Sequence, residues 1–173
     1  MRRAAFFDRD GVINEDKGYV GHKRNFVFMD GIFDLLKTLQ NNGYLLFIIT
    51  NQAGIARGYY TEEDYLELTK WMLGVFHENG IDFTNVYYCP FHPVHGIGKY
   101  KKESFYRKPN PGMIFQARDD YGLDLSQSLL IGDKDSDMEA GRRAGIGQLF
   151  FLSGKYPGTE SQDVKMLASV LEL

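Results

Sequence analysis

Two aspartates stand directly after a short apolar stretch near the start of the chain. Asp8 and Asp10 follow the apolar run Ala4–Phe7, and Gly11 comes next. Past the end of a strand the chain curls, so both carboxylates can face one crevice, and glycine permits the tight turn. Two nearby carboxylates repel each other unless a proton or a cation lies between them, and oxygen ligands suit Mg²⁺. A lone pair of this kind is more often a solvated turn or a helix cap.

A second acidic group comes late in the chain. The segment Gly132-Asp133-Lys134-Asp135-Ser136-Asp137 follows an apolar run and opens a predicted helix. Three acids in five positions favour a cation site, although some of them can simply cap the helix. Ser136 and Asp137 are the best candidates for that capping role.

Phosphate-binding groups occupy two further places. Thr50 follows the apolar run Leu45–Ile49, and Arg107 and Lys108 stand just before a predicted helix. A hydroxyl and free backbone N–H groups at a strand end can hold phosphate. Lysine as a point charge and arginine as a fork suit a doubly charged phosphate. An ordinary turn and a solvated loop remain the common explanations of each feature alone.

These residues lie between short apolar runs that alternate with amphipathic ones. The spacing predicts strands over 4–7, 45–49, 85–88, 129–131 and 149–152, and helices over 32–39, 61–76 and 138–144. It also predicts a helix capped by Asn110 with Pro111 in its first turn, and a terminal helix over 164–171. This alternation is typical of a parallel sheet of about five to six strands with helices on both faces. Ligands bind such sheets at the carboxyl ends of the strands, where the polar groups above would meet.

Composition limits the remaining possibilities. The chain has 173 residues, of which 43% are hydrophobic, a net charge of −3 and one cysteine. A single cysteine excludes a disulfide framework, and the nearly balanced charge argues against nucleic acid as the main partner. The longest apolar run, 44–49, is far too short to cross a membrane. We expect a single domain over residues 1–173, a monomer in the cytoplasm, with no nucleic-acid or membrane partner.

The order of acid pair, threonine, lysine and acid cluster is far more specific than any one of them. It resembles the four signature motifs of the haloacid dehalogenase-like (HAD) phosphatase superfamily. Within that superfamily the chain is similar to the D-glycero-D-manno-heptose 1,7-bisphosphate 7-phosphatase group and to the related histidinol phosphatases, in the segments DRDGVINEDKGYV, TNQAGIARGYYTEEDY, YYCPFHP, RKPNPGM and GDKDSDM. The resemblance implies a Rossmann-like sheet without a separate cap domain.

The resemblance also implies roles for the motif residues. Asp8 would be the nucleophile that forms an aspartyl-phosphate, and Asp10 the general acid and base. Thr50 and Lys108 would hold the phosphoryl oxygens. A Mg²⁺ ion would offset the repulsion between nucleophile and phosphate. Its expected ligands are Asp8, Asp133 and the backbone carbonyl of Asp10, with Lys134 contributing only through its backbone, if at all.

Without a cap domain, loops must select the substrate, which the resemblance implies is a small sugar phosphate. Arg107 is the natural contact for a second, anomeric phosphate, and Arg57 could assist it. The other expected substrate contacts form two groups, namely Asp16, Lys17, Gly18 and Tyr19, and then Asn51, Gln52 and Ala53. His22 lies close to the first group, and its role is open.

The chain departs from its relatives in the long loop 89–108. Many heptose bisphosphate phosphatases hold a structural zinc there with a Cys-x-His and a later Cys-x-Cys. Here Cys89 is present, but the other three positions hold Phe91, Ser104 and Tyr106. Since Cys89, His92 and His95 make only an incomplete set, we expect a packed loop without zinc, stabilised by aromatic side chains.

The resemblance implies that the chain removes the C7 phosphate of the heptose bisphosphate in nucleotide-activated heptose biosynthesis. Two other functions are alternatives to it. The first is hydrolysis of histidinol phosphate or another small phosphomonoester, which needs no second phosphate site. The second is a phosphosugar-binding protein without catalysis, since fold alone permits it. The complete set of motif residues argues against this second alternative.

Overall fold

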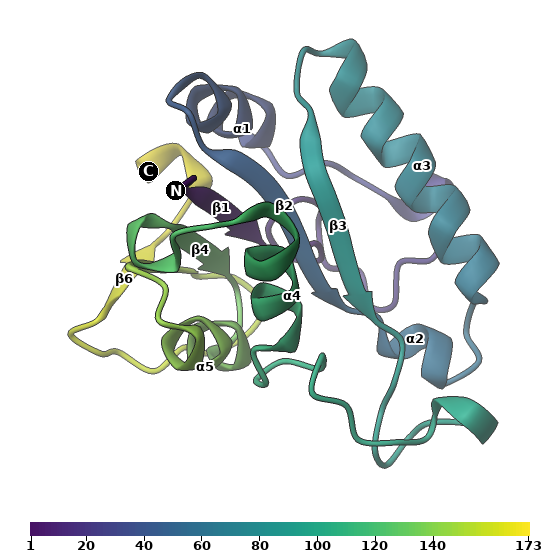
Figure 1. Cartoon of the computed structure of the whole chain (residues 1–173). Helices are drawn as coiled ribbons and strands as arrows, with labels where there is room; N and C mark the ends of the chain where they lie inside the picture. Colours follow the sequence, from purple (N-terminus) through teal and green to yellow (C-terminus); the bar gives the residue numbers. More distant parts are fainter.

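The computed structural model describes all 173 residues and contains one parallel sheet of six strands. The strands are β1 (Ala4–Phe7), β2 (Leu45–Asn51), β3 (Phe83–Cys89), β4 (Leu129–Gly132), β5 (Gln148–Leu152) and β6 (Val164–Leu167). Their order is β3-β2-β1-β4-β5-β6, and every neighbouring pair is parallel (Figure 1). The predicted α/β class with five to six strands is confirmed.

Helices lie between the strands along the chain. They are α1 (Ile32–Asn41), α2 (Ala53–Ala56), α3 (Glu62–Glu78), α4 (Gly112–Tyr121) and α5 (Asp135–Ala144), with short 3₁₀ turns η1 (Lys23–Asn25), η2 (Gly98–Tyr100), η3 (Leu125–Gln127) and η4 (Val170–Glu172). Thr61 caps α3 in a reciprocal capping box with Asp64, as its position before three acids predicts. None of these helices combines the length and apolar character that crossing a membrane requires.

The two faces of the sheet have separate cores. Side chains alternate along a strand, so Phe7 of β1 packs with residues of α1 and α3, while Phe6 packs with residues of α4 and α5. Both phenylalanines are fully buried. The central strands are covered by helices on both faces. Their sequences are therefore continuous apolar runs, without the alternation of apolar and polar residues that a half-exposed strand has.

Two sequence predictions were wrong at the ends of elements. Residues 164–171 form strand β6 and the turn η4 instead of a helix. Val164 and Met166 pack against one core and Leu167 packs against the other, as the alternation of side chains along a strand requires. The apolar positions also fit a helical spacing, and pairing with β5 makes this segment a strand. Asn110 does not cap α4, because its amide donates to the carbonyl of Ser104.

The strand order places the site. The chain runs outward from β1 to β2 and β3, then returns to the other side of β1 and continues through β4, β5 and β6. The reversal falls between β1 and β4, which pair with Phe7 beside Ile131. Asp8 and the Gly132–Asp133 turn therefore leave neighbouring strands at the switch point, where parallel sheets bind ligands.

Candidate active site

Three carboxylates meet at the carboxyl ends of β1 and β4. Oxygens of Asp8, Asp133 and Asp137 all lie within 4.8 Å of one another, and the three side chains are buried. Burial, and then the charge of Asp137, raises the pKa of Asp8. Burial, and then the charge of Asp8, raises the pKa of Asp133 to about 9. Such a group requires protons or a cation to balance its charge.

Lys108 supplies part of that balance. Its Nζ lies 3.0 Å from Asp8 Oδ1 and 2.6 Å from Asp137 Oδ1, and it donates to the carbonyl of Ile49 at 2.9 Å. Burial by itself would lower the pKa of Lys108, but Asp137 and Asp8 together hold it above its ordinary value. The ammonium group is therefore fixed beside the expected nucleophile, where it can contact a phosphoryl oxygen.

Asp137 has a larger role than the sequence indicates. As expected for a capping residue, its Oδ2 accepts from the backbone N–H groups of Asp133 and Lys134, both at 3.2 Å. Its other oxygen pairs with Lys108, a contact that the sequence analysis missed. No local signal reveals this pair, because Lys108 is 29 positions away in the chain.

Gly11 makes room for the acidic group. Its φ is +94°, a conformation that side chains disfavour, and a Cβ at this position would lie 1.9 Å from Asp133 Oδ2. The expected tight turn after Asp10 is confirmed, and the reason for glycine is steric as well as conformational.

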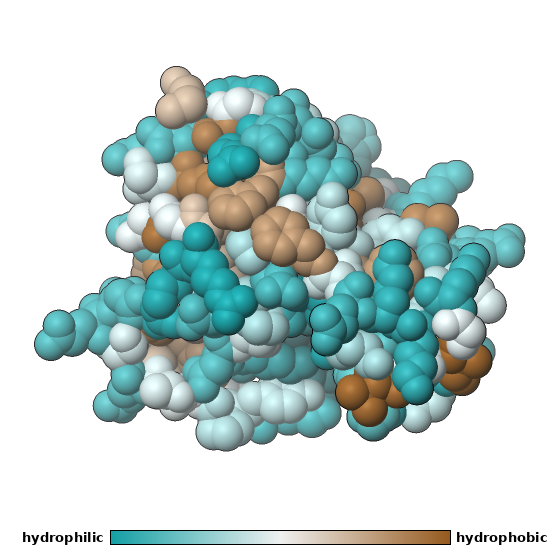
Figure 2. Space-filling model, turned by 60° about the horizontal axis from the view of Figure 1, so that its bottom comes forward, coloured by the Kyte–Doolittle hydropathy of each residue, from teal (hydrophilic) through white to brown (hydrophobic).

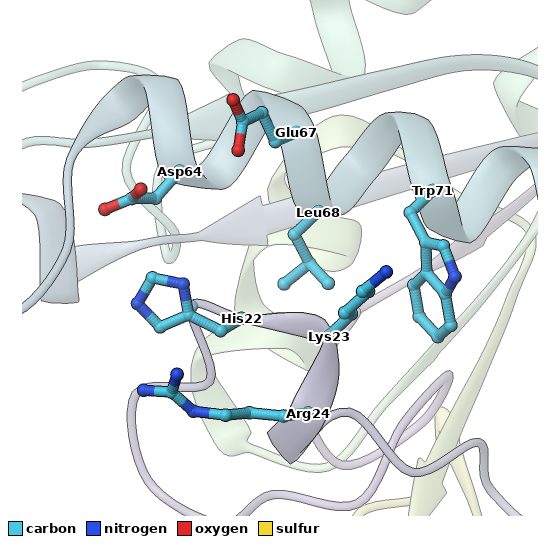
Figure 3. Close-up of a pocket in the computed structure, with 8 residues that line it drawn as sticks. His22, Lys23, Arg24, Asp64, Glu67, Leu68 and Trp71 are labelled. Atoms are coloured by element: carbon cyan, nitrogen blue, oxygen red, sulfur yellow. The ribbon is translucent and has the colours of Figure 1, made fainter.

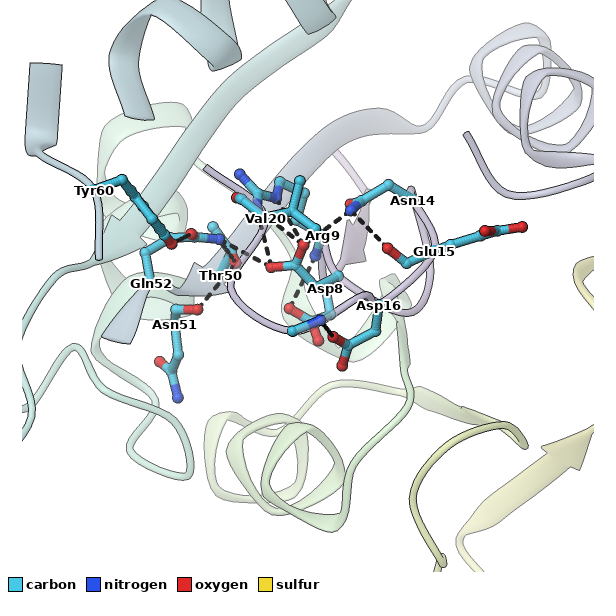
Figure 4. Close-up of polar contacts among 12 residues, drawn as sticks. Asp8, Arg9, Asn14, Glu15, Asp16, Val20, Thr50, Asn51, Gln52 and Tyr60 are labelled. Carbon is cyan, nitrogen blue, oxygen red and sulfur yellow. Dashed lines mark hydrogen bonds and ion pairs between the residues drawn. The ribbon is translucent and has the colours of Figure 1, made fainter. Parts of the chain in front are cut away.

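Asp10 faces a different set of partners from Asp8. Its Oδ1 accepts from Arg9 Nη2 and Asn14 Nδ2, both at 2.9 Å, and its Oδ2 accepts from Gln52 Nε2 at 3.1 Å. Figure 4 labels the three donor residues. The Asp10 carbonyl accepts no backbone hydrogen bond. This leaves its oxygen available as the metal ligand expected from the sequence.

The residues at the carboxyl end of β2 and just after it are used mainly inside the protein. Thr50 is fully buried and accepts from Gln52 Nε2 at 2.9 Å. Asn51 forms a reciprocal pair with the backbone of Lys108, donating to its carbonyl at 3.1 Å and accepting from its N–H at 3.0 Å. Asn51, Gln52 and Ala53 still line the cavity described next. We therefore expect the side-chain amides of Asn51 and Gln52 to position Lys108 and Asp10 more than to select a substrate.

A cavity of about 630 Å³ opens beside these residues. Its lining includes Asp10 and Lys108 together with two guanidinium groups, those of Arg57 and Arg107. Arg57 Nε and Arg107 Nη1 are both buried without a hydrogen-bond partner, and neither residue forms an ion pair. Figure 2 brings this end of the sheet forward and shows a mostly hydrophilic face with separate small hydrophobic groups.

The loop after Asn14 contributes one wall. Asp16, Gly18 and Tyr19 line the cavity as expected, whereas Lys17 is exposed and outside the lining. Two residues that the sequence analysis missed, Lys155 and Tyr156, line it from the segment after β5. Lys155 Nζ lies 3.8 Å from Asp16 Oδ1. They follow an unremarkable Ser-Gly turn, so only the fold reveals them.

The Lys134 backbone, considered above as a possible metal ligand, is used at the start of helix α5 instead. Its carbonyl accepts from the N–H groups of Asp137 and Met138 in the first turn of α5. Its side chain lines the cavity, with Nζ 4.6 Å from the centre of the Tyr156 ring. We therefore leave Lys134 out of the metal ligands and count it among the cations near the substrate.

The long loop packs without an evident metal-ligand set. Cys89 is fully buried, and His92 Nδ1 accepts from the N–H groups of Val94 and His95. The Phe91 ring lies 4.2 Å from Lys102 Nζ and 6.2 Å from the Tyr100 ring, so aromatic contacts do occur here. Whether the loop holds zinc remains a prediction.

His22, whose role the sequence left open, lies outside this site. It lines a second cavity of about 450 Å³ between η1 and α3, with Lys23, Arg24, Asp64, Glu67 and Trp71 (Figure 3). The two cavities share no lining residue. Basic side chains on one rim oppose acidic ones on the other, so this second cavity favours neither anions nor cations.

The acidic group suits a divalent cation with oxygen ligands. Asp137 is already bound to Lys108 and two N–H groups, whereas Asp133 Oδ1 is buried without a partner. Burial and then repulsion between the carboxylates raise the pKa of Asp8 and Asp133, and such an ion would relieve that repulsion. Asp8 and Asp133, with the carbonyl of Asp10, are thus the oxygen donors that fit Mg²⁺.

Comparison with known proteins agrees with this geometry. A HAD-hydrolase-like family model matches residues 105–171. D-glycero-alpha-D-manno-heptose-1,7-bisphosphate 7-phosphatase of Burkholderia mallei is 58% identical over 87% of this chain and 79% of its own length. The corresponding beta enzyme of Vibrio cholerae is 47% identical over 97% of this chain and 89% of its own.

A solved structure has the same fold. That of D,D-heptose 1,7-bisphosphate phosphatase from B. bronchiseptica, complexed with magnesium and phosphate, has a TM-score of 0.81 at 22% identity and covers 97% of this chain and 93% of that one. The expected architecture is confirmed by this likeness, and the expected relationship by the sequence identities. The chain belongs to the HAD superfamily of phosphatases, in the group that contains the heptose-1,7-bisphosphate 7-phosphatases.

Proposed function

We propose that this phosphatase removes the C7 phosphate of D-glycero-D-manno-heptose 1,7-bisphosphate, in an Mg²⁺-dependent reaction through an aspartyl-phosphate. The names of its relatives support the substrate. The observation that supports a substrate with two phosphates is that Arg57 and Arg107 lie without acidic partners in the same cavity as Asp10 and Lys108. Both side chains are half-buried, and one nitrogen of each is enclosed without an acceptor, which a second phosphate would supply.

In the first step, an oxygen of Asp8 attacks phosphorus and the bond to the sugar oxygen breaks. Asp10 gives its proton to the leaving oxygen, so a neutral alcohol departs. Lys108 and the Thr50 hydroxyl would stabilise the phosphoryl oxygens as their charge changes. The contacts of Lys108 with Asp8 and Asp137 support this placement, since they hold its ammonium group beside the attacking oxygen.

In the second step, water attacks the phosphorus of the aspartyl-phosphate and gives a proton to Asp10. The bond between Asp8 and phosphorus then breaks, which releases inorganic phosphate and restores both carboxyl groups. Mg²⁺ held by Asp8, Asp133 and the Asp10 carbonyl would supply positive charge against the repulsion between these anions.

The substrate is tested by comparing kcat/KM for the alpha and beta anomers of heptose 1,7-bisphosphate with that for histidinol phosphate, at saturating Mg²⁺. We expect kcat/KM for at least one anomer to exceed that for histidinol phosphate by about ten- to a hundredfold, since a charge-assisted second contact contributes about 1.5–3 kcal/mol. A preference for histidinol phosphate would contradict the proposal. No Mg²⁺-dependent turnover of any phosphate ester would instead favour a phosphosugar-binding protein.

A further inference from the structure

Arg9 lies between the two catalytic aspartates and is directed into the protein. Its side chain is 1% exposed. Nη2 contacts both oxygens of Asp10, at 2.9 and 3.1 Å, and also donates to the carbonyl of Val20 at 2.6 Å. Nε lies 3.3 Å from Asp10 Oδ1. One guanidinium therefore connects the Asp10 carboxylate with the end of the loop that forms a wall of the cavity.

Gln52 holds the other side of the same carboxylate. Its Nε2 donates to Asp10 Oδ2 and to Thr50 Oγ1, and its Oε1 accepts from the hydroxyl of Tyr60 (Figure 4). Gln52 and Tyr60 are both buried. With Asn14 Nδ2 also donating to Oδ1, both oxygens of Asp10 have more than one donor, so the orientation of the carboxyl group is fixed.

Stability alone does not explain Arg9. A buried cation loses its hydration, and well-packed apolar residues are often as stabilising or more so. Here Arg9 Nη1 is buried with no hydrogen-bond partner, so part of that loss is not offset. The only carboxylate that pairs with Arg9 is Asp10. Because Arg9 is costly to bury and its one ionic partner is Asp10, we infer that Arg9 serves catalysis.

We propose that Arg9, supported by Gln52, is a positioning residue that orients Asp10 for both proton transfers. This inference rests on the general acid and base role proposed for Asp10. When the bond from phosphorus to the leaving oxygen breaks, the proton passes from Asp10 to that oxygen. When water attacks the aspartyl-phosphate, a proton returns from water to Asp10. Because Arg9 is buried and does not line the cavity, it acts through Asp10.

The test uses two leaving groups that differ in their need for a proton. The alkoxide of a sugar needs protonation, whereas 4-nitrophenolate leaves readily without it. In Arg9→Met, which keeps length and removes the fork, kcat for heptose bisphosphate should fall by about a hundredfold or more, with KM little changed. With 4-nitrophenyl phosphate the first step should survive, giving a burst of one nitrophenolate per active site, followed by slow turnover because the second step still needs Asp10. Arg9→Lys, which keeps the charge, should fall between wild type and Arg9→Met.

Asp10→Asn is the reference variant and must itself show the burst. If it does not, the role proposed for Asp10 fails whatever Arg9 does. If Asp10→Asn gives the burst but a folded Arg9→Met loses the burst together with sugar-phosphate turnover, or loses neither, the Arg9 inference is overturned. Should Arg9→Met not fold, Gln52→Met decides, because it removes one donor to Asp10 without leaving a charge unpaired. Gln52→Met should slow turnover of the sugar phosphate while keeping the nitrophenolate burst, and loss of that burst would overturn the inference.

Discussion

Lys108 and Asp137 form a buried ion pair, with Nζ 2.6 Å from Oδ1 and the two residues only 4% and 2% exposed. The pair joins the loop before α4 to the first turn of α5. The same ammonium group contacts Asp8 after β1 at 3.0 Å. Three segments that are distant in the chain are thus linked through one lysine, so the position of Asp8 depends on the packing of all three.

The Lys108–Asp137 pair can be separated from catalysis by a double variant. Lys108→Met leaves buried carboxylates without their cation, and we expect it to lower the free energy of unfolding by about 3–5 kcal/mol without Mg²⁺. In Lys108→Met/Asp137→Asn the amide oxygen can still accept from the two backbone N–H groups, so most of that stability should return. Urea unfolding measures both changes. Turnover should stay lost in each variant, because a phosphoryl contact is missing.

Lys155→Met is the matched control for that experiment. Lys155 lines the same cavity but its side chain is half exposed, so its replacement should change stability by no more than about 0.5 kcal/mol. If Lys108→Met is as stable as this control, the buried pair does not have the structural role described above.

Magnesium should stabilise the protein more at higher pH. The pKa of Asp133 is raised to about 9 by burial and by Asp8, against about 4 for an unfolded aspartate. Between these values the folded metal-free protein binds a proton that the unfolded chain has released, so its stability falls as pH rises. Mg²⁺ competes for the same carboxylates, and its effect on Tm should therefore be larger at about pH 8 than at about pH 6.

Asp133→Asn is the control for the magnesium effect. This variant removes one ligand and one raised pKa, so the increase in Tm with Mg²⁺ should become smaller and nearly independent of pH. An equal magnesium effect at both pH values in the wild-type protein would show that the acidic group does not bind the ion.

Arg107→Ala tests the second phosphate. If Arg107 binds the phosphate that is not cleaved, kcat/KM for the bisphosphate should fall by about ten- to a hundredfold, while the slow hydrolysis of histidinol phosphate barely changes. Lys108→Met should reduce kcat/KM for the bisphosphate and for histidinol phosphate alike, because the two substrates share the reacting phosphoryl group. Equal losses for the two substrates in Arg107→Ala would place Arg107 in the reacting centre or in the fold.

The loop 89–108 should contain no stoichiometric zinc. Cys89 is buried, His92 already accepts two backbone hydrogen bonds, and Phe91, Ser104 and Tyr106 offer no strong ligand. Elemental analysis of protein purified without chelators checks this directly. One tightly held zinc per chain would contradict it and would implicate Cys89 together with His92 and His95.

The sequence predicts the centre of the sheet and the positions of the motif aspartates well, because both follow local rules. Short continuous apolar runs such as Leu45–Ile49 are typical of buried strands, and acids directly after such runs lie at the strand ends. Residues 164–171 were wrongly assigned to a helix because their apolar positions fit a helical spacing, whereas pairing with β5 makes residues 164–167 a strand.

The contacts between distant segments could not be predicted in the same way. Nothing near Asp137 indicates that Lys108 is its partner, and Arg9 in the segment Asp-Arg-Asp gives no sign of turning inward beneath Asp10. Lys155 reaches the cavity only because the segment after β5 returns across the sheet end. Such contacts depend on the strand order, which local sequence patterns do not specify.

The most direct test of the mechanism is the identity of the phosphorylated residue. Enzyme quenched during turnover is reduced with borohydride, which converts an aspartyl-phosphate into homoserine, and is then digested with trypsin. Cleavage after Arg3 and Arg9 puts Asp8 alone on the peptide 4–9 and Asp10 on the next one. We predict that peptide 4–9 loses one oxygen and gains two hydrogens, and that Asp8→Asn shows neither this change nor turnover. Reduction of the Asp10 peptide, or an unmodified peptide 4–9 at full turnover, would contradict the assignment of Asp8 as the nucleophile.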